Sequence, residues 1–255
     1  MTKHQGVALV VGGASGMGRL AAQRWSDSGR PCVAVDINEQ GLQETAARHS
    51  RIVTRCLDVT HASDVDQLVK EVVAEFGALE RVYNGAAIQP SQLLLNQDRA
   101  EIHRIMEINY GGLVNVSLST LSSMVEQGHG SLINFGSIAG WVPNMHFGAY
   151  AASKFAVVAF SEVLYHENRG RGVHVCCVCP SVVDTPLMLQ ATSNPKIVEV
   201  GPAPMAPVKV LTAIDKAIAK QRFWVFPGLH TQIGWRLRRF FPRLMWAVDH
   251  RAEGF

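Results

Sequence analysis

The fold is decided by residues 7–18, VALVVGGASGMG. Five apolar residues, three of them β-branched, predict a buried strand over 7–11. Glycines at 12, 16 and 18 let the backbone turn tightly from that strand into a helix and approach a pyrophosphate closely. The free N–H groups at the start of the helix, expected over 17–29, favour an anion. This stretch therefore predicts a dinucleotide-binding turn made of Gly12, Ser15, Gly16, Met17 and Gly18.

The same alternation of a short apolar run and a longer amphipathic run continues along the chain. Six further runs are typical of strands, at 31–36, 51–59, 81–86, 131–137, 173–180 and 223–226. Further helices are expected at 39–49, 63–76, 98–127, 148–169 and 207–221. Repeated β-α alternation with nearly continuous apolar strands predicts an α/β fold, a doubly wound parallel sheet of about seven strands covered on both faces.

Composition and length favour one large domain. The chain has 255 residues, 47% of them hydrophobic and 18% charged, which excludes disorder as the main state. We expect a catalytic domain over 1–228 and a basic, aromatic tail over 229–255. Residues 184–207 mix five prolines with apolar side chains, and we expect a lid over the site. A solvated connector is the alternative, but Leu187, Met188, Leu189 and Ile197 would be unusual in it.

The amino-terminal sequence and the cysteines indicate the cellular compartment in which the protein is expected. An apolar strand begins almost at once, which leaves no room for a signal peptide, and no run of about 18 uncharged apolar residues exists. The five cysteines are odd in number and fall in or beside strand-like runs, so reduced structural thiols are expected. The sequence thus predicts a cytoplasmic protein.

Asp36, at the end of the second predicted strand, bears on the choice of cofactor. It stands about 20 residues after the glycine turn, where a carboxylate accepts hydrogen bonds from a ribose diol. An acid there repels a 2′-phosphate, and no cation stands at Ser15 or Ile37 to offset that repulsion, so NAD is favoured over NADP. The alternative is that Asp36 only caps the helix starting near Asn38.

A tyrosine and a lysine open the helix predicted over 148–169. The four-residue spacing of Tyr150 and Lys154 places the phenol and the ammonium on one face. A nearby lysine favours the phenolate, so we expect a tyrosine pKa below its usual value, as a general acid/base needs. Ser137 stands at the end of the fifth predicted strand, and Asn109 stands in the long helix before it. Together with Tyr150 and Lys154 they form a candidate catalytic set that is more specific than the tyrosine–lysine spacing alone.

These residues together resemble the short-chain dehydrogenase/reductase family. The resemblance covers about residues 5–185 and rests on the VGGASGMG turn, Asp36, Asp58-Val59, Asn109, Ser137 and the YxxxK pair. It implies a Rossmann-like seven-stranded sheet, a nicotinamide cofactor, interconversion of alcohols and ketones, and a homodimer or homotetramer. The turn has Val11 instead of the usual Thr, and Gly85 and Ser181 also depart from the family pattern.

The resemblance also implies individual roles. Tyr150 would be the acid/base, Ser137 would hold the substrate oxygen, and Lys154 would bind the nicotinamide ribose and keep Tyr150 acidic. Asn109 would support a proton-relay water, and Thr185 would meet the carboxamide. The other positions implied for cofactor binding are Asp58, near the adenine, with Val59, Asn84, Ala86, Pro180 and Val183. Taken singly, Ser137 and Asp58 could be caps and Asn109 a satisfied core amide.

We expect an NAD-dependent oxidoreductase that interconverts a secondary alcohol and a ketone. Trp141, Met145, Phe147, Leu187 and Met188 flank the site, which suits a steroid, terpenoid or fatty-acyl-like substrate, although some of them could equally be core residues. His146 is expected to line the substrate pocket or to lie on the surface. No metal and no nucleic-acid partner is expected. The alternative is a catalytically silent protein that senses nucleotides or works at a membrane surface.

The net positive charge of the chain comes from its carboxyl-terminal end. The chain has a net charge of +3, and residues 222–255 hold six arginines against two acidic residues. Arginines interleaved with Trp, Phe and Leu, with Pro242 breaking any single helix, suit a segment lying in a membrane interface. Packing of the tail across the domain or a subunit partner, to close the substrate pocket, is the equal alternative.

Overall fold

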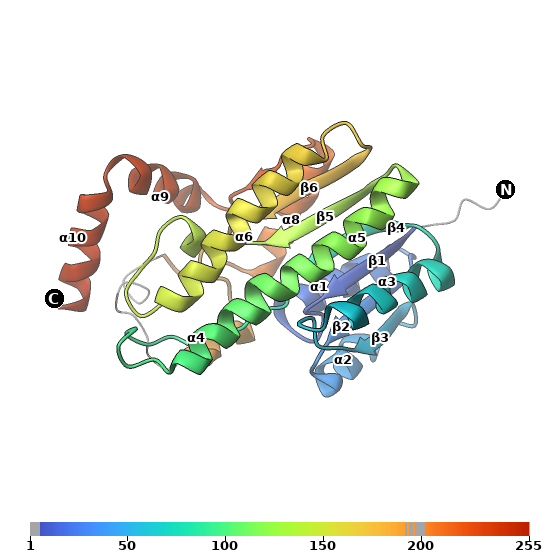
Figure 1. Ribbon diagram of the computed structural model, residues 1–255, viewed down its shortest axis with the longest axis horizontal. Helices are drawn as coiled ribbons and strands as arrows, with labels where there is room; N and C mark the ends of the chain where they lie inside the picture. The colour runs from blue at the N-terminus through green and yellow to red at the C-terminus, as the bar shows by residue number, and fades with distance from the viewer. Residues whose placement is uncertain (1–5, 192, 194–195, 197–201, 255) are drawn as a thin grey trace.

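The computed structural model describes residues 6–191, 193, 196 and 202–254. Seven parallel strands form one sheet in the order β3-β2-β1-β4-β5-β6-β7 (Figure 1). This confirms the predicted doubly wound, Rossmann-like single domain. The strands are β1 Val7–Val11, β2 Cys32–Asp36, β3 Ile52–Cys56, β4 Leu79–Asn84, β5 Gly130–Phe135, β6 Val173–Val178 and β7 Trp224–Val225.

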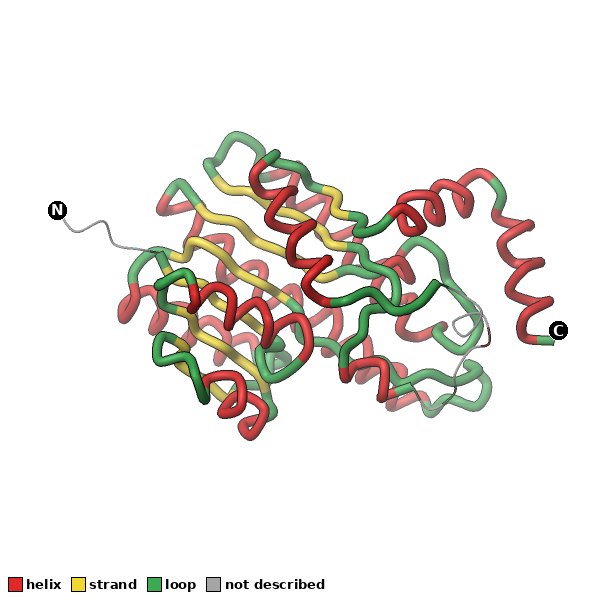
Figure 2. Tube along the Cα trace, turned by 180° about the vertical axis from the view of Figure 1, so that it is seen from behind, coloured by secondary structure: helices red, strands yellow, loops and turns green. Residues whose placement is uncertain are grey.

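Helices cover both faces of the sheet, which lies between them in both views (Figures 1 and 2). One face packs against α3 (Ala62–Phe76), α5 (Leu113–Gln127) and α6 (Gly148–Glu167). The other packs against α1 (Gly16–Asp27), α2 (Glu39–Ala46) and α8 (Pro207–Ala219). The remaining elements are α4 Arg99–Met106, η1 Glu107–Gly112, η2 Ile138–Gly140, η3 Pro186–Gln190, α9 Leu229–Phe240 and α10 Pro242–Glu253.

Strand β1 is buried on both faces. Val7, Leu9 and Val11 belong to the core under α3, α5 and α6, whereas Ala8 and Val10 belong to the core under α1, α2 and α8. Successive side chains of a strand point to opposite faces, so a strand buried on both sides needs apolar residues throughout. This explains the unbroken apolar run that marked it in the sequence.

The order of the strands reverses between β1 and β4. Val11 and Asn84 pair at the carboxyl ends of these two strands. In open parallel sheets, ligands bind in the crevice outside the carboxyl ends at such a switch point. The glycine turn after β1 therefore stands where the topology provides a binding crevice.

Two predicted elements differ from the observed ones. The helix expected over 98–127 is divided into α4, the π-helical turn η1 and α5. The strand expected over 51–59 ends at Cys56, because Asp58 accepts hydrogen bonds from the backbone and side chain of Thr60 and bends the chain. In the predicted lid, η3 forms a short helix next to the cleft, and Ile197 lies outside the described residues.

The tail forms two helices, α9 and α10, which meet at Pro242. Proline has no backbone N–H and is tolerated in a first helical turn, so α10 begins there. Both helices lie at the end of the molecule opposite the N-terminus (Figures 1 and 2). No helix among the described residues is long and apolar enough to cross a membrane.

Candidate active site

A cleft of about 340 Å³ opens at the carboxyl ends of the central strands. The glycine turn, the end of β2, the chain after β3 and the chain after β4 form its walls, and the start of the predicted lid forms its rim. The predicted site residues that line this cleft are Gly12, Ser15, Gly16, Met17, Gly18, Asp36, Asp58, Val59, Ala86 and Thr185.

The glycine turn has no room for side chains at two positions. Gly12 has a φ of +82°, and a Cβ there would lie 2.9 Å from the backbone nitrogen of Ala86. A Cβ at Gly18 would overlap the carbonyl oxygen of Gly12. These close approaches bring the strand, the turn and the helix together, which is the reason such turns require glycine.

The amino-terminal end of α1 faces the cleft. Its N-cap Ser15 makes no side-chain capping hydrogen bond, and no acidic residue stands in the first turn. The helix N-terminus thus retains N–H groups and partial positive charge for an anion. Although Val11 lacks the usual hydroxyl, the N–H of Gly85 donates to the carbonyl of Val11 over 3.0 Å, which ties the turn to the chain after β4.

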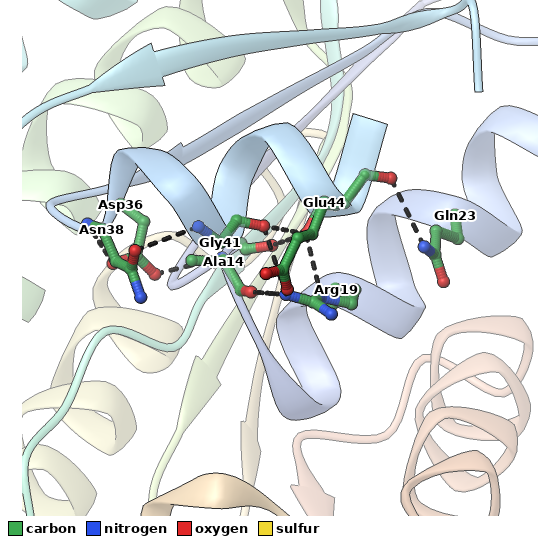
Figure 3. Close-up of polar contacts among 9 residues, drawn as sticks. Ala14, Arg19, Gln23, Asp36, Asn38, Gly41 and Glu44 are labelled. Carbon is green, nitrogen blue, oxygen red and sulfur yellow. Dashed lines mark hydrogen bonds and ion pairs between the residues drawn. The ribbon is translucent and has the colours of Figure 1, made fainter. Parts of the chain in front are cut away.

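Asp36 is held by backbone donors at the mouth of this turn (Figure 3). Its Oδ2 accepts a hydrogen bond from the N–H of Ala14, and its Oδ1 accepts one from the N–H of Asn38, each over 3.1 Å. Asn38 is the N-cap of α2, and its side chain accepts a hydrogen bond from Gly41. The helix cap is therefore Asn38, and the carboxylate of Asp36 remains a wall of the cleft.

Arg19 is the cation that follows the turn, and its side chain points away into α2 (Figure 3). The guanidinium donates to the carbonyl of Ala14 over 2.5 Å, to Oγ1 of Thr45 over 3.1 Å and to Oε2 of Glu44 over 2.8 Å. It also donates to the carbonyl of Gly41. Arg19 therefore fastens the turn to α2.

Asp58 and Val59 stand on the cleft wall just after β3, beside the strand end that carries Asp36. Hydrogen bonds from Thr60 lower the pKa of Asp58, so this carboxyl group is ionised at neutral pH. Its bonds to Thr60 form a turn ahead of α3, whose N-cap is His61, so Asp58 does not cap that helix; its place in the cleft wall is compatible with an adenine contact.

Five of the predicted cofactor contacts lie outside the set of residues that line the cleft: Asn84, Tyr150, Lys154, Pro180 and Val183. The amide of Asn84 is buried between β4 and α5, where it donates to Leu113 and Ser117. The carbonyl of Pro180 accepts a hydrogen bond from Ile138, and buried Val183 pairs with Met205. These residues hold the chain after β4 and β6 in place.

Tyr150, Lys154 and Ser137 come together beside the cleft. Tyr150 and Lys154 lie one turn apart on α6, with 6% and 3% of their surfaces exposed. Ser137 caps η2 through a hydrogen bond from Ala139 and also hydrogen-bonds Tyr150. Nζ of Lys154 donates to the carbonyl of Phe135 over 2.8 Å, and Phe135 lines the cleft.

Burial controls the protonation of this pair. It raises the pKa of Tyr150 to about 12, against a smaller lowering by the hydrogen bond with Ser137. It lowers the pKa of Lys154 to about 8. The structure thus differs from the expected acidic tyrosine. The ammonium is directed to the carbonyl of Phe135 and lies 5.7 Å from the centre of the Tyr150 ring. Loss of water outweighs the neighbouring charge.

Asn109 stands in η1 with its side chain fully engaged. Its Nδ2 donates to the carbonyl of Ile88 over 2.9 Å and to Oγ of Ser153 over 3.1 Å, and its Oδ1 accepts from the N–H of Ile88 over 2.8 Å. Ile88 lines the cleft. The amide is thus a satisfied core group that also fixes the cleft wall, and π-helical turns of this kind are frequent at functional sites.

The tail reaches back to the loop before α6, which the sequence did not reveal. Oδ2 of buried Asp249 accepts a hydrogen bond from the N–H of Met145 over 3.0 Å. Glu253 lies 3.6 Å from Nε2 of His146, a residue with a φ of +67°. The two acids are four residues apart and so lie on one face of α10, which was the only signal available in the sequence.

Aromatic rings join the start of the tail to the same loop. Trp235 of α9 packs against Trp141 and Phe226, with ring centres 5.4 and 5.6 Å apart. His230 and Ser181 form a hydrogen bond of 2.6 Å between α9 and the chain after β6. The inner side of the tail therefore packs against the loop before α6 and the chain after β6 and β7.

The described residues at the start of the predicted lid also contact neighbouring parts of the site. Oε1 of Gln190 accepts a hydrogen bond from the N–H of Gln89 over 2.9 Å, and Thr185 packs against the turn at Gly16. Oγ of Ser193 contacts Nδ1 of His146 over 2.9 Å. His146 thus joins this segment and the tail. No group of three His, Cys, Asp or Glu residues within the described ranges is arranged to hold a metal.

Comparisons with known proteins agree with this geometry. A family model described as short chain dehydrogenase matches residues 6–196. Sulfoacetaldehyde reductase 2 of Chromohalobacter salexigens is 34% identical over 196 residues, which cover 74% of this chain and 77% of that protein. Estradiol 17-beta-dehydrogenase 11 of Macaca fascicularis is 29% identical over 253 residues, which cover 96% of this chain and 82% of that protein.

Solved structures share the architecture as well. A short-chain dehydrogenase/reductase from Burkholderia phymatum, solved in complex with NAD, matches with a TM-score of 0.84 at 24% identity, and the match covers 96% of both chains. That likeness shows the fold, while the family model covers β1 to β6, the residues that line the cleft and the Tyr150–Lys154 pair.

Proposed function

Because the chain belongs to the short-chain dehydrogenase/reductase family, whose members are NAD(P)-dependent oxidoreductases acting on CH–OH groups, we propose that it uses NAD to interconvert a secondary alcohol and a ketone on an apolar substrate. The observation that supports this most strongly is the buried group of Tyr150, Ser137 and Lys154, which adjoins the cleft through Phe135.

The residues of the chain supply binding and proton transfer. When bound, the nicotinamide accepts or returns the hydride. Tyr150 donates its proton to the carbonyl oxygen during reduction, and its raised pKa keeps that proton in place until the acceptor arrives. In oxidation, the phenolate form of Tyr150 would take up the hydroxyl proton, and the charge of Lys154 one turn away would stabilise that phenolate. Ser137 donates a hydrogen bond to the substrate oxygen.

The cradle for the cofactor fits a dinucleotide. The close approaches at Gly12 and Gly18 and the uncapped start of α1 would hold the pyrophosphate. Asp36 would accept hydrogen bonds from the ribose diol and repel a 2′-phosphate. Arg19, the cation next to the turn, is engaged by Ala14, Thr45 and Glu44, which supports NAD over NADP.

An apolar substrate is supported by the side chains around the site. Phe147 packs against Tyr150, with ring centres 6.2 Å apart, and Leu187 lines the rim of the cleft. Among the relatives described above, the estradiol dehydrogenase matches nearly the whole chain, including the tail. A steroid-like or fatty-acyl-like secondary alcohol is the substrate class that these observations favour.

A homodimer or homotetramer remains part of the proposal. Helices α5 and α6 expose Leu118, Phe155 and Val163 to solvent, although long helices of a globular protein normally bury such residues. A second copy packed on these two helices would cover them. Sedimentation equilibrium of the wild-type chain and of a Leu118→Asp/Val163→Asp variant tests this, because only an interface there would give a smaller mass for the variant.

Activity is tested by following the absorbance of the reduced cofactor. The full chain is incubated with NAD or NADP and a panel of secondary alcohols, including hydroxysteroids, 3-hydroxyacyl thioesters and short polar alcohols. We expect turnover with NAD and an apolar alcohol. Absence of turnover with every alcohol and ketone, despite NAD binding measured by calorimetry, would instead support the catalytically silent nucleotide sensor.

A further inference from the structure

The outer side of the tail carries a continuous row of exposed apolar side chains. We define the apolar stripe as Leu229, Ile233, Leu237 and Phe240 of α9, Phe241 at the junction, and Leu244 and Val248 of α10; between 40% and 70% of each residue is exposed. Along each helix the members follow one another at three or four residues, so they share one face. Exposed apolar patches of this kind mark interaction surfaces.

The charge on the outside of the tail has one sign. Exposed Arg236, Arg239, Arg243 and Arg251 accompany the apolar stripe. The two acidic residues of the tail, Asp249 and Glu253, are turned inward against Met145 and His146, with 3% of Asp249 and 4% of the Glu253 side chain exposed. The outward surface therefore presents apolar side chains and arginines with no carboxylate of the tail between them.

We propose that the apolar stripe binds the surface of a membrane that carries anionic phospholipids. Helices with an apolar face and a basic polar face lie in the interface, with the apolar side about 5–10 Å below the headgroups. The arginines would contact the phosphates, each attracted by the negative surface potential. Anionic lipid complements both properties of this face, while Trp235 on the inner side of α9 stays packed on Trp141 and Phe226 and Asp249 of α10 stays bonded to Met145.

The same charges argue against a second copy of the chain as the occupant. Two apolar stripes facing each other would bring two sets of the same arginines together without intervening acids. Like charges facing each other across an interface weaken association. A dimer of the family type would instead use α5 and α6, which carry their own exposed apolar residues.

Membrane binding would place the site next to its substrate. The tail adjoins the loop of Met145 and His146 a few residues before Tyr150, at the end of the molecule toward which the strands run (Figure 1). Apolar alcohols partition into the lipid, so they would enter from the side that the stripe contacts. This link to substrate supply depends on the proposed function, whereas the binding of the stripe to lipid does not.

The test is cosedimentation of the full chain with vesicles. We expect binding to vesicles of phosphatidylcholine mixed with phosphatidylglycerol, weaker binding at high salt, and the chain in the supernatant with phosphatidylcholine alone. Replacing three arginines, in the variant Arg236→Gln/Arg239→Gln/Arg243→Gln, should lower the partition coefficient about 100-fold, about fivefold for each charge. The matched control Lys70→Gln/Lys209→Gln/Lys220→Gln removes three exposed charges elsewhere and should bind within about fivefold of wild type.

A second variant tests the apolar stripe itself. Phe240→Ser/Leu244→Ser/Val248→Ser should bind more than about tenfold more weakly with its arginines intact, and circular dichroism checks its folding. The proposal is overturned if wild-type chain stays in the supernatant with anionic vesicles or if the arginine variant binds as wild type does. It is also overturned if the serine variant only lowers the oligomer mass, because a second copy then covers the stripe. None of these readouts requires turnover.

Discussion

Lys154 places a charge in the interior, and its removal should stabilise the chain without cofactor. In the unfolded chain this ammonium has a pKa of 10.5, and burial lowers it to about 8 in the folded chain. At pH 7 that difference costs the folded state about 3 kcal/mol. The hydrogen bond from Lys154 to Phe135 stabilises the wild-type folded state by about 1 kcal/mol, and the variant Lys154→Met loses it. We expect the variant to be about 2 kcal/mol more stable at pH 7.

The gain should depend on pH in a defined direction. Between pH 8 and pH 10 the unfolded wild-type chain holds the lysine proton and the folded chain does not, so wild-type stability rises with pH. The advantage of Lys154→Met should shrink by about 2 kcal/mol over this window. The difference between the unfolding free energies of the two proteins is taken at each pH. The contributions of the buried cysteines and of Tyr150, whose raised pKa values lower stability as the pH rises, are common to both proteins and cancel.

Urea denaturation at pH 7, 8, 9 and 10 measures both effects. For a chain of this size, about 2 kcal/mol corresponds to a rise in Tm of about 4–8 °C at pH 7. Lys70→Met, at an exposed position on α3, is the matched control and should change stability by less than about 0.5 kcal/mol. A Lys154→Met chain less stable than wild type at pH 7, or a difference independent of pH, would refute the reasoning.

Three further changes test the site. Tyr150→Phe should lower kcat by about 10² to 10⁴ while NAD still binds, since only the proton-transferring hydroxyl is lost; turnover within a few-fold of wild type contradicts the assignment. Asp36→Ala should weaken NAD and admit NADP by about 1–3 kcal/mol in calorimetric titrations; wild-type protein that already binds both equally speaks against it. Gly18→Ala should abolish NAD binding, because its methyl overlaps Gly12, whereas Gly234→Ala, which has open space, should bind normally; equal affinities would exclude the close-approach argument.

Local patterns predicted the sheet and most of the cleft. The glycine turn, Asp36 and the Tyr150–Lys154 spacing each depend on residues close in sequence, where strand and helix periodicity fix the geometry. Contacts between distant segments could not be read in the same way. Asp249 meets Met145 across 104 positions, and no period in the sequence encodes that pairing.

The protonation states of Tyr150 and Lys154 and the direction of polar side chains also could not be predicted from the sequence. Spacing placed Lys154 beside Tyr150, but the depth of burial, which raises one pKa and lowers the other, depends on the packed core. Asn84 stands at the end of β4 as expected, yet its amide turns into the sheet because Leu113 and Ser117 accept hydrogen bonds there. A position on a strand end does not fix which way a polar side chain points.

The engagement of Arg19 bears on how readily the cofactor preference of this chain could change. Removing the carboxylate of Asp36 lifts a repulsion but supplies no positive charge, since Arg19 is held by Ala14, Thr45 and Glu44. An engineered or natural switch toward a phosphorylated cofactor would have to release that guanidinium or introduce a new cation, for example at Ile37 on the rim of the cleft. The NAD preference that we propose would therefore be relaxed by one substitution at Asp36 but reversed only by a further change that supplies a positive charge.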